Sequence, residues 1–471
     1  MVFATLYTFG LKSGVGADTL SQFFKLIRID THVGVSASAL RTQMQLMETL
    51  LPQFQISCEQ MIEKQPIKIT AGLDETFFGD FIILVLMDLR SGYLLLEEIT
   101  EDRCFDTWYE KTTPRLEQLG IKVTHVVSDR AKALIKMAVT GFKCESGADI
   151  FHAQQDASRW LGAKVGKCQA SAEKKVAVTQ KAEHKPSKKQ TGFQRLVLKE
   201  HRINAEKALT HATNTQDYHD NLQGIAEEVH PFSLIDNSIN NAKDVEKGLE
   251  NRIQALEKIA KKQGSNNNTK ILKKLHNQFE PLSVSVSFWW AMVRETLQYL
   301  TTSKEELKLK DWLLSILLPV VYWHYKYKQT KHSTTKEKYY NAWKLASDAF
   351  QSHSFTLQLS EDKIHDWLIW AENLAPQFQR SSSAVEGRNG CLSQMHHNGR
   401  GLTEKRLKAL TVIHNYGIKR HDHSTAAMRL FNAEFPDLFS WLLDEMGELP
   451  LPRKARQRKI ANPLKLIDVP S

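Results

Sequence analysis

The sequence predicts an α/β protein, in which a mixed β-sheet is interrupted by a large all-α insertion and preceded by a helix-turn-helix-like helical region. Residues 67–160 contain several β-type runs separated by helical stretches, whereas residues 161–375 are almost entirely helical and polar. Residues 1–66 show helical spacing on both sides of a short break. At 471 residues, the chain is longer than one ordinary domain and has room for such an insertion.

Composition excludes several classes of protein. Apolar residues make up 42% and charged residues 25% of the chain, which is typical of a folded globular protein and not of a disordered or collagen-like one. Lysine and arginine number 63 against 53 acidic residues, a net charge of +10 that is compatible with a polyanionic partner. The five scattered cysteines contain no CxxC pair, so neither a disulfide framework nor a cysteine zinc site is expected.

No membrane segment or secretory signal is expected. The N-terminal segment lacks the charged start and long apolar region of a secretory signal. The longest apolar stretch, Trp312 to Trp323, is too short to cross a bilayer and contains Pro319. We therefore predict that this stretch is a core helix, and that the protein is intracellular.

The N-terminal region, residues 1–66, has the outline of a DNA-reading motif. Leu20 to Ile27 has helical spacing, a break follows around Gly34, and Ser36 or Ser38 is expected to cap a second helix. In that helix Leu40, Met44, Met47 and Leu51 share one face, whereas Arg41 and Gln43 are expected on the exposed side as DNA-binding residues. A plain helical hairpin with no DNA contact has the same outline and remains the alternative.

The first part of the core, residues 67–160, is expected to contain three strands in a meander followed by alternating helices and strands. Gly120 is a typical helix end, and Pro114 is expected to kink or split the helix before it. The expected strands are Ile67–Phe77, Phe81–Leu89, Tyr93–Thr100, Ile121–Ser128 and a short one near Asp149–Phe151, with helices over Asp106–Leu119 and Ala131–Val139. This order is that of the ribonuclease H-like fold.

Beyond residue 160 we expect a helical insertion at 161–375, a closing part of the core at 376–425 with a helix from Ala384, and a C-terminal helical region with a basic tail at 426–471. Lys164 to Glu200 carries ten basic residues against three glutamates, which is typical of a solvated segment or of one that follows a phosphate backbone. The same two readings apply to the tail, which has five basic residues in Arg453–Lys459.

Three acidic residues are predicted to form a metal site. Asp74 lies in the first strand, Asp129 follows the fourth, and Glu386 lies on the helix that opens residues 376–425. If the first and fourth strands are parallel neighbours, Asp74 and Asp129 lie side by side, and a helix crossing the sheet can supply Glu386. In-line chemistry at phosphodiesters commonly uses two divalent ions about 4 Å apart, held by carboxylates. Taken singly, each residue is more often a turn, cap or solvent-facing acid.

Two other acidic residues are expected outside this site. Glu75 follows Asp74 on a strand, so its side chain should point to the opposite face. Asp88 closes the second strand and is likewise not expected to belong to the site.

The segments GLDETFFGDFIILVLMDLRSGYLLLEE, VVSDRAKALIK and SSSAVEGRNGCLSQMHHNGRG resemble those of DDE transposases encoded by bacterial insertion sequences. The resemblance covers about residues 67–160 and 376–425, and the stretch between them resembles the helical insertions that several such enzymes carry. It implies a catalytic triad of Asp74, Asp129 and Glu386 that binds two ions of Mg²⁺ (or Mn²⁺). The insertion itself has no diagnostic motif.

Neighbouring residues are assigned supporting roles. Arg388 and Asn389 are expected to touch phosphate or orient a water, and Arg130 and Lys132 to bind the DNA backbone. His152 is expected either to support the metal ligands or simply to pack. The adjacent histidines His396 and His397 are expected at the surface, because neighbours on a helix point to different sides.

The predicted function is therefore DNA cleavage and strand transfer at the ends of a mobile element, by a bacterial cytoplasmic protein associated with the nucleoid. Double-stranded DNA is the expected partner, a homo-oligomer on DNA the expected assembly, and no membrane is involved. The alternative is a truncated or inactive transposase-derived protein that only binds DNA. A third possibility is another ribonuclease H-like nuclease with an RNA-containing substrate.

Overall fold

The computed structural model describes residues 1–63, 65–183, 191–265, 269–301, 303–397 and 401–452. The chain divides into two compact units. One unit is Lys64–Asn389, which contains the sheet and the helical insertion, and the other combines Met1–Glu63 with Gly390–Ser471. Each unit is described by itself below.

The sheet is mixed and has five strands in the order β3-β2-β1-β4-β5. β1 pairs antiparallel with β2, and β2 with β3, whereas β1 with β4 and β4 with β5 are parallel. The predicted meander with added parallel strands is thus confirmed. The bounds are β1 Ile67–Phe78, β2 Phe81–Asp88, β3 Leu94–Thr100, β4 Ile121–Ser128 and β5 Glu145–Ala148.

Tight turns fix the meander. Gly79 between β1 and β2 has a φ of 64°, a left-handed conformation that glycine adopts without steric cost. After β2, one carboxylate oxygen of Asp88 accepts hydrogen bonds from the backbone N–H and the hydroxyl of Ser91. Asp88 therefore stabilises the turn before β3. Ile83 to Met87 in β2 are all buried, as expected of a strand covered on both faces.

The helix α4 (Phe105–Leu119) ends at Gly120, whose φ of 66° provides the predicted stop. Of the kink or split predicted at Pro114, the split is wrong, because α4 continues through this residue. The cost of the proline is a missing hydrogen bond to the carbonyl of Glu110, and Glu110 is exposed, so water can replace the lost donor.

The short strand predicted near Asp149–Phe151 lies earlier, as β5 at Glu145–Ala148. Ile150 and Phe151 instead begin the long helix α6 (Ile150–Glu183), because an Asp149 carboxylate oxygen accepts a hydrogen bond from the Phe151 backbone N–H and caps the helix. Before β5, the predicted helix at Ala131–Val139 is found as α5 (Lys132–Lys136), followed by the π-helix η3 (Met137–Phe142).

β1 extends beyond the end of β4. The parallel register aligns Gly72 with Val127, and β4 ends at the next residue, Ser128. From Asp74 onward, β1 is paired only with β2, so its other edge is left open. This open edge is where the candidate site lies.

The insertion is mostly helical, as predicted, although residues 229–241 form a non-helical connection with an isolated β-bridge between Phe232 and Ile239. Its core is rich in tryptophan: Trp289, Trp312 and Trp323 are almost fully buried, and Trp312 to Trp323 is confirmed as a core segment. After α6 the helices are α7 Thr191–Glu228, α8 Ala242–Lys262, α9 Thr269–His276, α10 Phe279–Thr296, α11 Lys304–Trp312, η4 Leu313–Leu317, α12 Leu318–Gln329, α13 Ser333–Ser352, α14 Ser354–Gln358, α15 Glu361–Leu374 and η5 Ala375–Gln377. The helix α16 (Ser383–Met395) follows and carries Glu386.

The second unit joins the two ends of the chain. α3 (Ala37–Gln60) contacts α17 (Glu404–Val412) and α19 (Leu438–Met446), and Phe54 packs edge-on against Tyr416. The N-terminal and C-terminal regions, predicted as separate parts, thus share one core. The other elements are α1 Val2–Thr5, the π-helix η1 Leu6–Lys12, α2 Ala17–Leu26, η2 Ile29–Thr31, η7 Ile413–Gly417 and α18 Ala426–Phe431.

The predicted start of α3 is confirmed. The Ser36 hydroxyl accepts a hydrogen bond of 3.3 Å from the Ala39 backbone N–H. The predicted apolar face is buried as well, with Leu40, Met44, Met47 and Leu51 each at most 1% exposed. The basic tail segment Arg453–Lys459 lies outside the described residues. None of the described helices has the length and apolar character needed to cross a membrane.

Candidate metal centre

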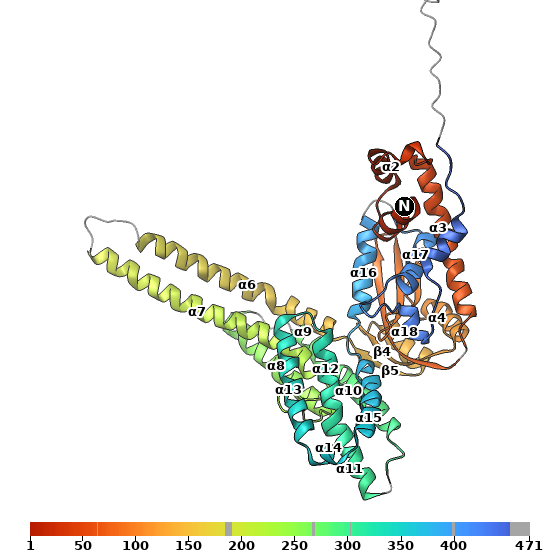
Figure 1. The fold of residues 1–471 in the computed structure, drawn as a ribbon. Helices are drawn as coiled ribbons and strands as arrows, with labels where there is room; N and C mark the ends of the chain where they lie inside the picture. Colours follow the sequence, from red (N-terminus) through yellow and green to blue (C-terminus); the bar gives the residue numbers. More distant parts are fainter. Residues whose placement is uncertain (64, 184–190, 266–268, 302, 398–400, 453–471) are drawn as a thin grey trace, which may run out of the picture. The chain divides into compact units, whose positions relative to one another are not determined.

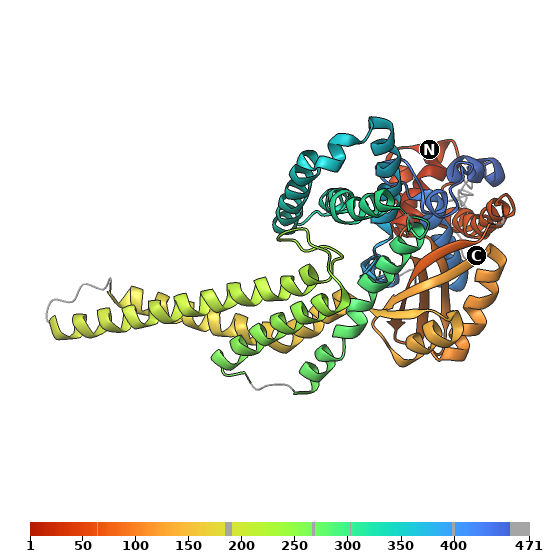
Figure 2. The same ribbon diagram turned by 90° about the horizontal axis from the view of Figure 1, so that it is seen from below.

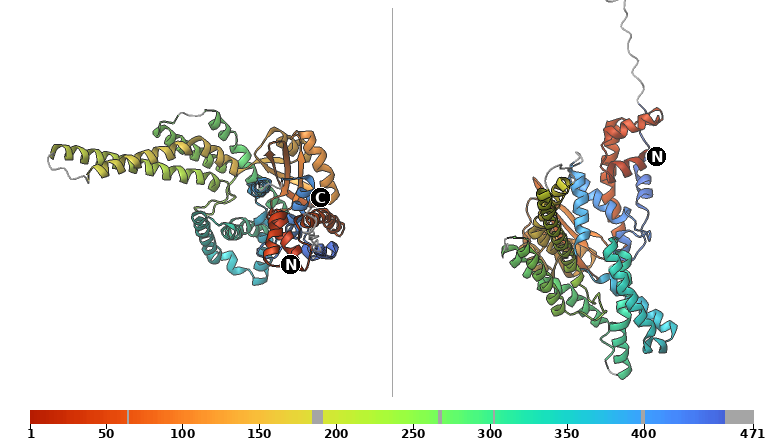
Figure 3. Two further views of the ribbon diagram at one scale, coloured as in Figure 1. Left: turned by 90° about the horizontal axis from the view of Figure 1, so that it is seen from above. Right: turned by 90° about the vertical axis from the view of Figure 1, so that its left-hand side faces the viewer.

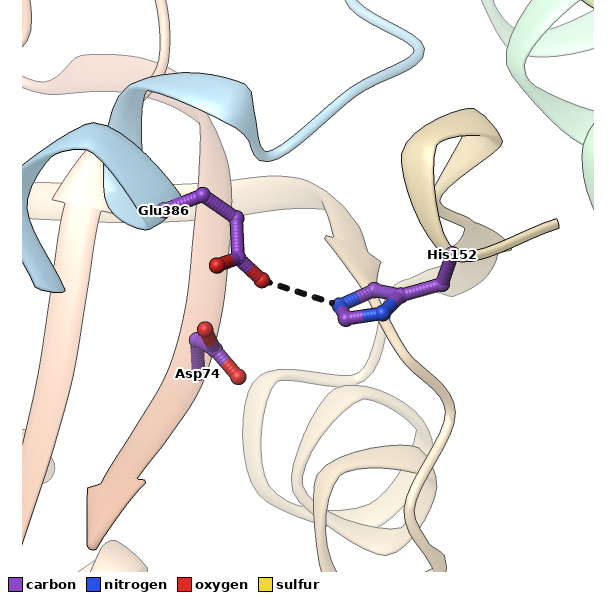
Figure 4. A group of neighbouring side chains, drawn as sticks. All are labelled: Asp74, His152 and Glu386. Atoms are coloured by element: carbon purple, nitrogen blue, oxygen red, sulfur yellow. Dashed lines mark ion pairs between the residues drawn. The ribbon is translucent and has the colours of Figure 1, made fainter. Parts of the chain in front are cut away.

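Asp74, His152 and Glu386 converge at the open edge of β1. Each offers one ligand atom, and these three atoms lie within 4.8 Å of one another (Figure 4). Asp74 comes from β1, His152 from the first turn of α6, and Glu386 from the first turn of α16. Residues separated by more than 300 positions in the sequence thus face one another across one small site.

The start of α6 and the approach to α16 are bonded to each other. The second carboxylate oxygen of Asp149 accepts a hydrogen bond from the Ser382 hydroxyl, and the Ile150 backbone N–H donates to the Arg380 carbonyl at 3.1 Å. Arg380 in turn donates its guanidinium to the carbonyls of Ala226 and Val229 in the insertion. These contacts hold His152 and Glu386 at a fixed mutual position.

A buried ion pair fastens α16 to the sheet. Arg388 donates two hydrogen bonds of 2.7 Å to the two carboxylate oxygens of Glu97 on β3, and both side chains are at most 5% exposed. The sequence predicted that Arg388 would touch phosphate. The structure instead gives its guanidinium a partner inside the protein, one turn beyond the start of α16.

Asn389, on the same helix, contacts Asp74 directly. Its amide nitrogen donates a 2.7 Å hydrogen bond to an Asp74 carboxylate oxygen. The amide oxygen of Asn389 is buried and has no hydrogen-bond partner among the described residues. Asn389 therefore orients Asp74 and leaves one buried acceptor within the pocket that both residues line.

The charges of the three residues are coupled. Burial, and then the nearby Glu386 carboxylate, raise the pKa of Asp74 to about 7. The contact with His152, whose Nε2 lies 3.2 Å from Glu386 Oε1, lowers the pKa of Glu386 despite its partial burial. Burial alone would lower the pKa of His152, but the adjacent carboxylates of Glu386, Asp149 and Asp74 outweigh it and raise that pKa.

Asp129 lies beside this group but outside it. It follows β4, lines the same pocket as Asp74, and uses one carboxylate oxygen to accept a 2.8 Å hydrogen bond from the Ala131 backbone N–H. In the described residues, the group of three mutually close ligands does not include Asp129. The strands place Asp129 next to Asp74 as predicted from the topology, but its carboxylate turns toward the following loop.

Glu75 lines this pocket too, although the sequence suggested that it would face away. Burial, and then the charge of Asp129, raise the pKa of Glu75, while Arg103 counteracts them with an ion pair of 3.2 Å. The other carboxylate oxygen of Glu75 is buried without a hydrogen-bond partner in the described chain. The pocket reaches residues on both faces of β1 because β4 no longer covers this edge of the strand.

The pocket has a volume of about 540 Å³ and also contains cationic side chains. Arg103, Arg159 and Lys274 line it, and Lys274 pairs with Asp156 at 2.7 Å. Of the two cations predicted beside Asp129, Lys132 is exposed, whereas Arg130 turns inward and donates to the Ser146 carbonyl. A pocket lined by both carboxylates and cations can accept a phosphate together with a metal ion.

The two predicted DNA-binding residues of α3 belong to the other unit. Arg41 is exposed and forms an ion pair with Asp18 on α2. Gln43 is half-buried, and its side-chain oxygen is buried without a hydrogen-bond partner among the described residues. The outline of two helices separated by a short turn is present, and the DNA contact stays a prediction.

The donor set fits a divalent cation. Two carboxylates and an imidazole within 4.8 Å of one another are typical ligands for Mn²⁺, while carboxylates alone suit Mg²⁺. The raised pKa of Asp74 and the unpartnered oxygen of Asn389 are both features that a bound cation would relieve.

Some members of this site escaped sequence reasoning. His152 was predicted only as a supporting or packing residue, whereas its ring is one of the three mutually close ligands. The available signal was the spacing Asp149-Ile-Phe-His152, since positions i and i+3 at a helix start lie on one face. The Glu97–Arg388 pair had no such signal, because 291 residues separate its members.

Comparison with known proteins gives one family match. The family model described as "Family of unknown function (DUF6399)" matches residues 313–458. This stretch includes Glu386, Arg388 and Asn389, whereas Asp74, Asp129 and His152 precede it. The comparison with curated proteins gave no match. This chain is thus similar over residues 313–458 to a family whose function is not assigned.

Proposed function

We propose that this protein is a DDE-type DNA transposase that cleaves DNA and joins the cut strands using a divalent metal held at Asp74 and Glu386. The observation that carries the proposal is the meeting of these two carboxylates with His152 in a pocket that also contains Asp129 and three cationic side chains. The strand order β3-β2-β1-β4-β5 supports a ribonuclease H-like core, and the resemblance around Asp74, Asp129 and Glu386 supports the transposase class.

Each residue has a role that follows from its contacts. Asp74 and Glu386 supply the oxygen ligands, and Asn389 fixes the orientation of Asp74 through its amide. His152 balances the charge of Glu386 in the metal-free protein and is a third donor atom when its Nε2 is deprotonated. Arg159 and Lys274 line the same pocket and are suited to hold a phosphate. When bound, a divalent ion polarises the phosphodiester and lowers the pKa of a bound water.

Asp129 is proposed as a further ligand. Its present hydrogen bond to the Ala131 backbone is a capping contact, which occupies only one of its two carboxylate oxygens. The other oxygen is available to turn toward Asp74 when DNA and metal are bound. Its charge also raises the pKa of Glu75, which lines the same pocket.

The alternative, a protein that only binds DNA, is less well supported. Burying carboxylates near one another destabilises a protein. A protein that only binds DNA has no catalytic need to keep such a cluster. Here the costly arrangement is intact, since Asp74 is 8% exposed and sits beside Glu386. We therefore favour an active site over a remnant.

The proposal is tested by nicking of supercoiled plasmid DNA and by joining of labelled duplex ends to it. Wild-type protein is expected to nick with Mg²⁺ or Mn²⁺ and not with EDTA, and Asp129→Ala and Glu386→Gln are expected to lose nicking. Asp80→Asn is a matched control, because Asp80 is an exposed acid in the turn next to Asp74's strand. Its activity should equal that of wild type.

Two results would count against the proposal. Wild-type protein that binds DNA but never nicks it would favour the binding-only alternative. Cleavage restricted to RNA-containing duplexes would favour a ribonuclease H-like nuclease of another class.

A further inference from the structure

α6 and α7 form a long antiparallel hairpin within the larger unit (Figures 1 and 2). His152 stands at its base in the first turn of α6, and the outer end of the hairpin has no other described helix beside it (Figure 3). This element adds nothing to the metal centre beyond His152 and the pocket residues that follow it, Gln155, Asp156 and Arg159. Its length therefore calls for a separate explanation.

A basic groove lies between the two helices, some way out from the base. We use this name for the hollow of about 260 Å³ whose nine lining residues, from both helices, include four lysines. Its lining lysines are Lys164, Lys167 and Lys175 on α6 and Lys207 on α7, and His211 on α7 lies beside them. No acidic residue lines the groove, and the four lysines are exposed.

The groove differs from an ordinary solvated helix face. On such faces lysines are usually interspersed with acids that pair with them, as Arg202 and Glu206 pair elsewhere on α7. None of the four groove lysines forms an ion pair with another described residue. In addition, His211 Nδ1 is buried and has no hydrogen-bond partner in the described chain. The groove is thus a concave cationic surface without internal counter-charges.

The spacing of the lysines suits an extended polyanion. Lys164 and Lys175 are eleven residues apart on one helix, about 16 Å at 1.5 Å per residue. Successive phosphates along one strand of DNA advance about 3.4 Å along the axis, so this span covers several of them. A small anion would need one or two of these lysines, whereas a nucleic-acid backbone can use all four.

We infer that the basic groove binds the phosphate backbone of the DNA that enters the metal centre. The supporting geometry is proximity along one helix: Lys164 follows His152 by twelve residues on α6, about 18 Å, and Arg159, which lines the catalytic pocket, lies between them in sequence. This inference rests on the proposed function, because it assigns the groove to the same substrate.

The test is the salt dependence of duplex DNA binding, which is measured by fluorescence anisotropy in the absence of metal. The variant replaces Lys164, Lys167, Lys175 and Lys207 with glutamine. Each lost phosphate contact removes about 0.9 from the magnitude of the negative slope of log K against log salt. The slope of the variant should therefore be shallower by roughly three to four. The Kd should rise roughly tenfold or more at 0.1 M salt.

A control variant removes the same charge elsewhere in the same unit. It replaces Lys304, Lys308, Lys344 and Lys363, which are exposed on α11, α13 and α15, with glutamine. This variant should keep nearly the wild-type slope. Equal losses in both variants, or no loss in the groove variant, would overturn the inference.

The outcome is separable from that of the proposed function. If the groove variant binds DNA like wild type while wild type nicks DNA with metal, the groove is not a DNA site and the proposed enzymatic function stands. If the groove variant loses DNA affinity while wild type never nicks DNA, the groove is a DNA site and the proposed enzymatic function is wrong. Single-stranded DNA and RNA of equal length, run in parallel, show which backbone is preferred.

Discussion

Replacing Asp74 with asparagine is expected to abolish metal-dependent nicking and, in the same protein, to raise the melting temperature of the metal-free form. Activity falls by about 10³-fold or more, because a metal-bound transition state loses several kcal/mol of stabilisation. Stability rises because Asp74 is buried and its carboxylate lies within 4.8 Å of that of Glu386. Asparagine removes this repulsion and can still accept the hydrogen bond from Asn389.

The stability gain should depend on pH in a defined direction. The pKa of Asp74 is raised from 3.8 to about 7, so the folded protein binds a proton that the unfolded chain has released between these values. The destabilisation that the Asp74 carboxylate causes in wild type is therefore absent below about pH 4, grows as the pH rises, and is complete above about pH 7. The free energy of unfolding of Asp74→Asn should exceed that of wild type by about 2–4 kcal/mol above pH 7, and by progressively less toward pH 4.

Thermal unfolding in EDTA at several pH values measures this difference, with Asp80→Asn as the exposed control. Adding Mn²⁺ should stabilise wild type and not Asp74→Asn, since only wild type retains both carboxylates. If Asp74→Asn were less stable than wild type above pH 7, the repulsion that we assign to Asp74 and Glu386 would be wrong.

Replacing Arg388 with methionine is expected to cause the largest loss of stability among single substitutions on α16. The change leaves the Glu97 carboxylate buried without its two hydrogen bonds from the guanidinium. Removing one member of a buried ion pair costs about 3–5 kcal/mol, whereas replacing both members with apolar residues is often nearly neutral. The double variant Glu97→Met/Arg388→Met should therefore recover much of the loss.

Urea or thermal unfolding checks this, with Arg202→Met as the control. Arg202 also pairs with a glutamate, but on the exposed surface of α7, where such pairs contribute less than about 1 kcal/mol. Arg388→Met should also lose nicking under conditions in which it remains folded, because α16 carries both Glu386 and Asn389. A loss no greater than that of Arg202→Met would show that the buried pair does not hold α16.

The strands were predictable where the pattern was local. β1, β2, β3 and β4 are bounded by glycine turns or by Gly120, and their apolar runs are unlike the helical stretches around them. β5 was misplaced because its sequence, Glu-Ser-Gly-Ala, has little apolar content, and its position is fixed by pairing with β4. Pairing with β4 determines where β5 lies, and the local sequence pattern does not show this pairing.

The site was predictable in its acids and less so in its surroundings. Asp74 and Asp129 could be placed together from the strand order, and Glu386 could be added from the resemblance of its motif. The orientation of Asp129 could not, because it depends on a capping contact with Ala131 in the loop after β4. Glu75 was expected to be shielded by the sheet, but β4 ends early and the pocket extends around the open edge of β1. Side-chain alternation alone does not reveal where a neighbouring strand stops.

The most direct test of the central claim is a crystal structure of the protein soaked or grown with Mn²⁺, examined for anomalous scattering. We predict a peak within about 2.5 Å of carboxylate oxygens of both Asp74 and Glu386, and no such peak in crystals of Glu386→Gln grown in the same way. Mn²⁺ bound only at other positions, with both carboxylates free of metal in the wild-type crystals, would contradict the proposed metal centre.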